Sequence, residues 1–130
     1  MIKGRIMKLT NIEMDNYLQA MRNISEKVTG KFAYAVARNI RKISEELVEY
    51  KSLKDKAIYK YGEQRDDGSA VIKVGTEAYD KFIDEMKEYA DISHDVPIQM
   101  ITKEELLSSS LNANEILTID FMIEEGGTNE

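Results

Sequence analysis

Apolar residues recur at spacings of three and four along residues 31–61, a stretch without proline or glycine. The positions that share this spacing are Ala33, Val36, Ile40, Ile43, Leu47, Tyr50, Ala57 and Tyr61, with one interruption at Lys54. Such a periodicity is typical of an amphipathic helix. At about 1.5 Å per residue this helix would be roughly 45 Å long. We therefore expect one long helix, with the other elements packed along its sides.

The preceding residues predict a second helix over 10–28. Thr10 and Glu13 have the spacing of a capping box, in which each side chain satisfies a free backbone N–H at the helix start. The predicted buried face consists of Met14, Tyr17, Leu18, Met21, Ile24 and Val28. Thr29 and Gly30 end this helix. The short connection predicts an antiparallel helical hairpin with the long helix.

A third helix is predicted over residues 76–91, with Thr76 as its N-cap. Residues 6–9 and 97–101 predict short strands, and Pro97 suits the first residue or the edge of one. Residues 70–74 are short and β-branched, and they form either a strand or an extended lead-in to the third helix. We expect 6–9 to pair with 97–101, with 70–74 beside them as a third strand.

The last part of the chain begins with a second capping box, Thr102 with Glu105, which predicts a short helix. Residues 115–123 leave two alternatives open. They form a helix capped by Asn112 or Asn114, or a strand, because Ile119, Phe121 and Ile123 alternate.

These elements predict an α+β fold that is mostly α, with a long helical hairpin, further helices and a small two- or three-stranded β-sheet. The length predicts a single domain over 1–130, ending in a flexible acidic tail at 124–130. Lys3, Gly4 and Arg5 can be encoded by a purine-rich stretch that resembles a bacterial ribosome-binding site. Such a site would stand just before a start codon at Met7. We therefore hypothesise that translation starts at Met7 and that 1–6 are a non-native extension, which the intact mass of the native protein would test.

Composition narrows the class of protein. The chain has no cysteine and a net charge of −6. No segment has the roughly 18 consecutive apolar residues of a membrane span. Direct nucleic-acid binding is disfavoured because it requires clustered Lys and Arg. We expect a cytoplasmic protein that does not bind a membrane.

Acidic side chains share one face of the predicted third helix, opposite its apolar stripe. They are Glu77, Asp80, Asp84, Glu88 and Asp91, and we refer to them as the acidic ridge. The ridge predicts contact with a protein partner that is basic or binds nucleic acid. A solvated outer face has the same pattern and is the alternative explanation.

Three tyrosines lie near the end of the predicted long helix: Tyr50, Tyr59 and Tyr61. Aromatic residues are enriched at protein interfaces. If the long helix extends beyond its own domain, these residues would contact a partner or a second copy in a homodimer.

No pattern indicates an enzyme. His94, the only histidine, lacks the convergent ligands of a metal site and the orienting partner of a general base, and we place it near a helix end. We therefore predict no catalytic residues, no metal and no cofactor.

Several segments resemble an uncharacterised family of small proteins from phages and prophages of Gram-positive bacteria. They are MKLTNIEMDNYLQAM, VARNIRKISEEL, KYGEQRDDGS, DVPIQMI and FMIEE. The resemblance implies a phage or prophage origin, expression in the bacterial cytoplasm and a protein that acts by binding. By analogy with small acidic phage proteins that lack catalytic residues, our leading hypothesis is a non-enzymatic protein-binding module that inhibits a host or antiviral defence complex. The alternative is a virion or assembly accessory protein that oligomerises through its long helix.

Overall fold

The computed structural model describes residues 4–124. The helices are α1 (Asn11–Ile24), α2 (Gly30–Glu46), α3 (Val48–Tyr61), α4 (Glu77–Ala90), α5 (Lys103–Leu107) and α6 (Ala113–Thr118), with 3₁₀ turns η1 (Ser25–Lys27) and η2 (Asp120–Met122). The strands are β1 (Gly4–Thr10), β2 (Glu63–Gln64), β3 (Ala70–Val71) and β4 (Ser93–Gln99). The predicted α+β class with mostly helical content is confirmed.

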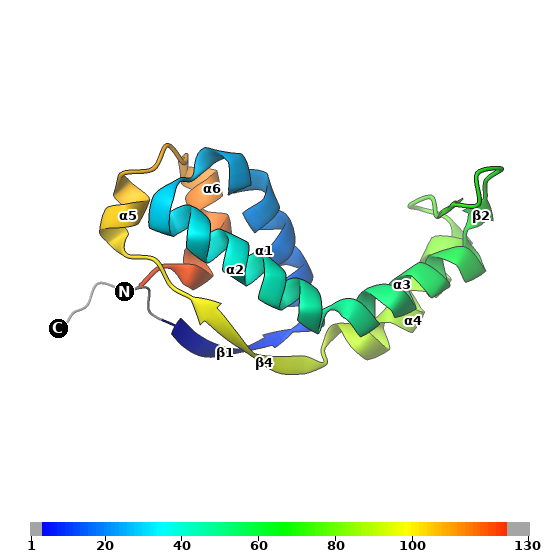
Figure 1. Cartoon of the computed structure of the whole chain (residues 1–130). Coiled ribbons are helices and arrows are strands. Elements are labelled where there is room, and N and C mark those ends of the chain that lie inside the picture. The colour runs from blue at the N-terminus through cyan, green and yellow to red at the C-terminus, as the bar shows by residue number, and fades with distance from the viewer. Residues whose placement is uncertain (1–3, 125–130) are drawn as a thin grey trace.

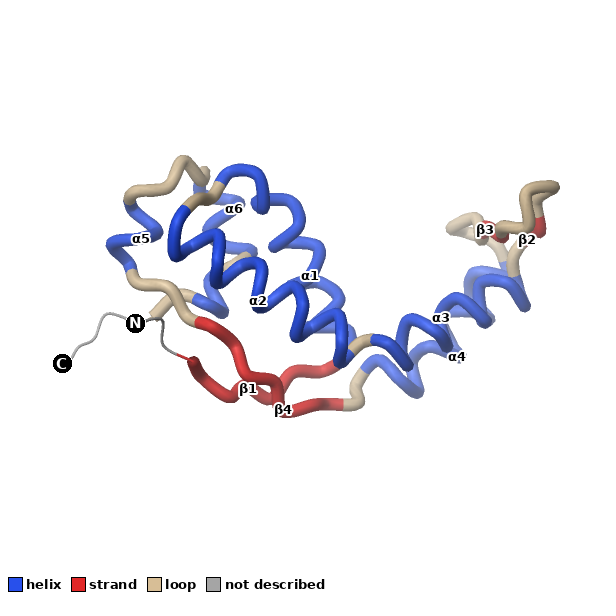
Figure 2. Tube along the Cα trace, in the orientation of Figure 1, coloured by secondary structure: helices blue, strands red, loops and turns tan. Residues whose placement is uncertain are grey.

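The chain has a body and a projecting arm (Figure 1). In the body, α1, α2, α5 and α6 gather above strands β1 and β4. In the arm, α3 and α4 run side by side away from the body, and β2 and β3 form the tip (Figure 2).

The predicted pairing of the N-terminal strand with the segment around Pro97 is confirmed. β1 and β4 are antiparallel, with Gly4 opposite Gln99 and Thr10 opposite Ser93. Residues 4–6 of the hypothesised extension therefore lie within β1. The expected third strand at 70–74 was misplaced, because β3 pairs with β2 in a separate sheet at the tip of the arm.

The expected single helix over 31–61 is interrupted at Leu47, where the chain bends between α2 and α3. Leu47 has φ −89° and ψ 1° and is fully buried. The bend contains no proline or glycine, and the hydrogen bond from Lys51 N to Leu47 O is kept at 2.8 Å. Its cause is packing, since α2 lies on β4 and α1, whereas α3 lies on α4. Most of the predicted apolar seam is buried, but it faces two different partners.

The predicted helix starts are confirmed. Thr10 and Glu13 form a capping box, as do Thr102 and Glu105, and the Thr76 hydroxyl accepts a hydrogen bond from Tyr79 N. The predicted end of the first helix at 28 is wrong, because α1 ends at Ile24 and the 3₁₀ turn η1 leads into the connection to α2. The two helices lie side by side. Gly30 adopts a positive φ of 62° at this connection.

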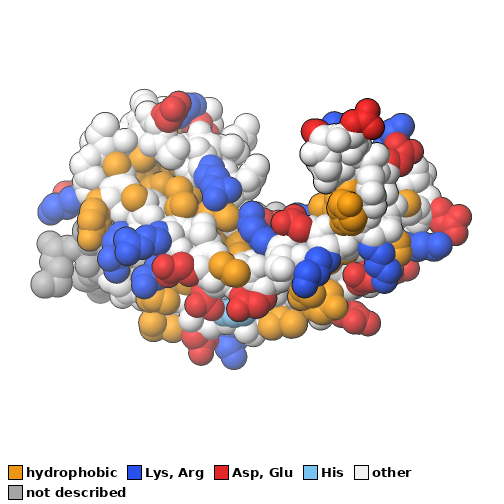
Figure 3. Space-filling view, turned by 45° about the vertical axis from the view of Figure 1, so that its right-hand side comes forward, with side chains coloured by type: hydrophobic (Ala, Val, Ile, Leu, Met, Phe, Trp, Pro, Cys, Tyr) orange, Lys and Arg blue, Asp and Glu red, His pale blue; other side chains and the backbone are white. Residues whose placement is uncertain are grey.

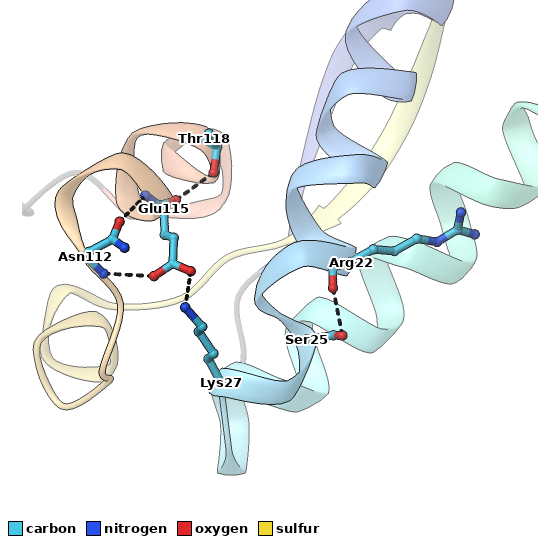
Figure 4. A network of polar contacts seen from close by, with 6 residues as sticks. All are labelled: Arg22, Ser25, Lys27, Asn112, Glu115 and Thr118. Carbon is cyan, nitrogen blue, oxygen red and sulfur yellow. Dashed lines mark hydrogen bonds and ion pairs between the residues drawn. The ribbon is translucent and has the colours of Figure 1, made fainter.

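The C-terminal segment follows the helical alternative, since α6 and the 3₁₀ turn η2 occupy most of it, and the strand alternative is reduced to a single bridge at Ile123. α6 is capped by Asn112, which exchanges hydrogen bonds with Glu115, and Lys27 pairs with Glu115 across the gap to η1 (Figure 4). Further on, Ile123 forms a parallel bridge with Ile101. Glu124 N donates to Ile101 O at 2.7 Å, so the expected tail does not begin at 124. The rest of that tail, residues 125–130, lies outside the described residues.

The core lies between α1, α2 and the inner face of β4. Its fully buried side chains include Met14, Leu18, Met21, Ile24, Val36, Ile43, Val96, Ile98, Ile101, Ile119 and Met122. At the rim of this core, the rings of Tyr17 and Phe121 stack with centroids 4.0 Å apart.

A buried amide on α2 connects this helix to the sheet. Asn39 on α2 is fully buried. Its Oδ1 accepts from Gln99 N at 2.8 Å, and its Nδ2 donates to Gln99 O at 3.0 Å. The backbone N–H and C=O of Gln99 thereby both have hydrogen-bond partners on the side away from β1, as backbone groups that are removed from water require.

We predict that Asn39→Leu lowers the free energy of unfolding by about 2–4 kcal/mol, because it leaves the partly buried backbone donor and acceptor of Gln99 without partners. Urea unfolding followed by circular dichroism measures this. Asn23→Leu, at an exposed position of α1, is the control and should change stability by less than about 0.5 kcal/mol. Equal losses in the two variants would show that the amide pair contributes nothing specific.

Candidate functional site

All five residues of the acidic ridge are exposed, four of them on α4 and Asp91 at its C-cap. They lie on the outer side of the arm, opposite Phe82 and Met86, which are buried against α3. Figure 3 shows the arm standing apart from the body, with acidic side chains spread over it among basic ones. The arm therefore presents the ridge to solvent along most of its length.

Ion pairs within α4 neutralise part of the ridge. Glu77 pairs with Lys81 at 3.7 Å, and Asp84 pairs with Lys87 at 3.6 Å. Both are exposed pairs on one helix, which contribute only a few tenths of a kcal/mol. A basic partner could therefore replace these lysines at little cost.

The three predicted tyrosines have different environments. Tyr50 is only 5% exposed, so it belongs to the core and its prediction as a surface contact is corrected. An aromatic on an apolar seam has the same spacing whether it faces the core or a partner. Tyr59 is half exposed. Tyr61 is partly buried, and its hydroxyl donates to Glu85 Oε1 at 2.9 Å.

The structure brings part of the ridge together with Tyr61. A shallow depression of about 550 Å³ on the flank of the arm is lined by Tyr61, Lys81, Asp84, Glu85, Glu88 and Tyr89. Lys60 Nζ lies 3.2 Å from Glu85 Oε1 and 4.9 Å from the centre of the Tyr61 ring. Carboxylates beside aromatic rings form a surface that attracts lysine and arginine side chains.

Sequence analysis missed Glu85 and Tyr89, which line this depression. Glu85 lies between the ridge and the apolar stripe, so its position on α4 did not single it out. Its importance comes from the facing helix, since both Lys60 and Tyr61 of α3 contact its carboxylate. No spacing within one helix indicates such a contact.

A second cavity, of about 390 Å³, lies where the arm joins the body. It is lined by Asn11, Glu45, Glu46, Glu49, Tyr50, Leu53, Tyr89, Ile92 and His94. The buried Asn11 Nδ2 donates to Tyr89 O at 2.9 Å, and its Oδ1 lies 2.9 Å from His94 Nε2. His94 Nδ1 is 3.2 Å from Glu46 Oε1. His94 is thus on β4 rather than at a helix end, and this chain of contacts holds the base of the arm.

Residues 4–124 contain neither a metal-binding cluster nor a membrane-spanning helix. No group of three or more His, Asp or Glu side chains is arranged to hold a metal ion. None of the helices in this range has both the length and the apolar character needed to cross a bilayer.

Comparison of the chain with protein-family models, with curated proteins and with solved structures found no match.

The contacts of Glu85 predict its titration. The hydrogen bond from the Tyr61 hydroxyl, followed by that from Lys60, lowers the pKa of the Glu85 carboxyl below its ordinary value. A carboxyl whose pKa is lowered by folding contributes stability above its unfolded pKa, and that contribution is lost as the pH falls through the folded value. We predict that Tyr61→Phe raises the pKa of Glu85 towards its ordinary value.

NMR titration of the Glu85 side-chain carboxyl carbon measures this shift. Tyr59→Phe removes a hydroxyl from the exposed side of the same helix and should leave the titration of Glu85 unchanged. An unchanged pKa in Tyr61→Phe would mean that the tyrosine hydrogen bond does not form in solution.

Proposed function

We propose that this chain is a non-enzymatic protein-binding module that docks a basic partner on the acidic ridge of its arm. The observation that carries the proposal is the exposure of all five ridge carboxylates along a helix that projects from the body and at its C-cap. A projecting helix can be contacted along its outer face and its flank at once, without any rearrangement of the core.

Electrostatics supports a basic partner. Among the described residues, Asp80, Glu88 and Asp91 make no ion pair within 4.0 Å, so their charges are available to lysine or arginine from outside. Proteins that bind nucleic acid present clustered Lys and Arg on their binding surfaces. The ridge therefore suits a partner of that class, and contact would cover its nucleic-acid site.

The resemblance to small phage and prophage proteins supports a phage-encoded inhibitor of a host or antiviral defence complex, acting in the bacterial cytoplasm. The alternative proposal is a virion or assembly accessory protein that oligomerises through the 31–61 seam. We prefer the inhibitor, because Val36, Ile43 and Leu47 of that seam are buried within the chain itself. Recovery of the protein from purified phage particles would instead favour the assembly role.

We predict that reversing three ridge charges, by Asp84→Lys, Glu88→Lys and Asp91→Lys together, abolishes capture of the partner. These positions avoid the first turn of α4, where acidic side chains stabilise the helix. The measurement is affinity purification of the tagged chain from the bacterium that produces it. Stoichiometric partners are then identified by mass spectrometry and their affinities measured by calorimetry.

The matched control reverses three exposed acidic residues elsewhere on the arm: Asp55→Lys, Glu63→Lys and Asp66→Lys. The net charge changes equally in both triple variants, so only the location of the change differs. We expect the control to keep the partner. Loss of the partner in both variants would indicate a response to overall charge, and loss in neither would remove the ridge from the interface.

A further inference from the structure

The two edges of the β1–β4 sheet differ in their availability for pairing. In an antiparallel ladder, successive residues point their N–H and C=O groups alternately towards and away from the neighbouring strand. Gln99 directs both groups to Asn39, away from β1. Its register partner Gly4 must therefore also direct its groups away from β4.

The same alternation assigns the rest of β1. Gly4, Ile6, Lys8 and Thr10 face the outer edge, whereas Arg5, Met7 and Leu9 bond with β4. Two contacts agree with this assignment. Thr10 N donates to the Glu13 side chain instead of to a strand, and Asn11 N, the next in line, bonds to Ile92 O at 3.0 Å.

The outer edge of β4 is closed along its second half. Pro97, opposite Ile6, has no N–H to offer. The backbone N–H and C=O of Gln99 are both bonded to the Asn39 side chain. Beyond it, Ile101 N donates to Met122 O, and Ile101 O accepts from Glu124 N. Devices of this kind prevent a sheet edge from pairing with another chain.

Among residues 4–124, no proline, side-chain amide or further strand closes the outer edge of β1. Within residues 4–124, β4 is the only strand that pairs with β1, and Gly4, Ile6 and Lys8 face outward without a strand partner. The Ile6 side chain is 66% exposed. An edge of this kind is a template for an added strand.

We propose that a second copy of this chain adds its own β1 antiparallel to β1, which gives a twofold dimer with strand order β4–β1–β1–β4. In the register centred on Ile6, Gly4 of each copy lies opposite Lys8 of the other. The outward N–H groups of Gly4, Ile6 and Lys8 then each meet a C=O, and the two Ile6 side chains cover one another.

Charge and symmetry favour this occupant. Like charges directly opposite one another on paired strands are destabilising. In that register Arg5 faces Met7 and Lys8 faces Gly4, so no such pair occurs. The two outer strands of the four-stranded sheet are the copies of β4, whose edges are closed from Pro97 onward. The contact is isologous and ends at two copies instead of continuing as a fibre.

Single cysteines test the register directly, because the chain contains none. In the proposed pair the two Ile6 Cα atoms are about 5.5 Å apart, within the range that a disulfide spans. Ile6→Cys should therefore give a covalent dimer on mild oxidation, seen by non-reducing electrophoresis. Lys8→Cys should not, since its two copies would be roughly 13 Å apart along the strands.

A non-covalent measurement is light scattering after size exclusion across a concentration series. We expect the mass of the wild-type chain to rise from 14.9 kDa towards twice that value. Ile6→Lys, which places two lysines face to face, should weaken dimerisation by about tenfold or more. Leu117→Lys is the matched control, at an α6 side chain that is 68% exposed, and should behave as the wild type.

Several results would overturn the proposal. They are a wild-type chain that stays monomeric at all concentrations, a dimer equally weakened by both lysine variants, and a disulfide at Lys8→Cys but not at Ile6→Cys. Circular dichroism of each variant confirms that the fold is kept.

A chain started at Met7 lacks Gly4 and Ile6, two of the three outward residues, and should be monomeric. These outcomes are independent of the acidic ridge, because every variant leaves α4 intact.

Discussion

The hydrogen-bonded pair between Asn39 and the backbone of Gln99 sets how the helical layer sits on the sheet. One side-chain amide satisfies both the donor and the acceptor of a single strand residue, which is possible at only one position of α2 along β4. The Asn39 Nδ2 also approaches Met122 Sδ at 3.7 Å, so the C-terminal segment closes over the same point. The core packing of α2, β4 and η2 therefore depends on this one polar contact inside an apolar interior, where an unpaired amide would be costly.

The direction of the arm follows from how α2 is held. Because α2 lies on the sheet up to Glu46, its continuation can reach α4 only by bending, and the buried Leu47 is where the direction changes. Two contacts then fix the base of the arm. The Asn11 amide donates to Tyr89 O, and Lys54 Nζ lies 3.4 Å from Asp15 Oδ2 of α1. The bend at Leu47 turns α3 away from the body. Because α4 packs on α3, the acidic ridge is carried away from the body with it.

The sequence was sufficient wherever the structure depends on local spacing. The Thr10 and Thr102 capping boxes and the apolar stripe of α4 are local patterns, and so their positions could be predicted. The bend at Leu47 could not, because a straight and a bent helix require the same apolar spacing. Tyr50 was assigned to a surface for a similar reason. The contacts of Asn39 and Asn11 join residues 60 or more positions apart, and no pattern along the chain indicates which buried amide meets which backbone group.

The two proposed surfaces act together if both form. The acidic ridge lies on the arm and the open edge lies on β1 of the body, so strand pairing leaves the ridge of each copy free (Figure 1). A twofold dimer would carry two arms and two ridges related by the same axis. Binding of the first arm would then raise the effective concentration of the second at its target, which increases affinity without any new type of contact. This gain requires a partner with two basic sites at matching spacing, a condition that a partner with its own twofold symmetry can meet.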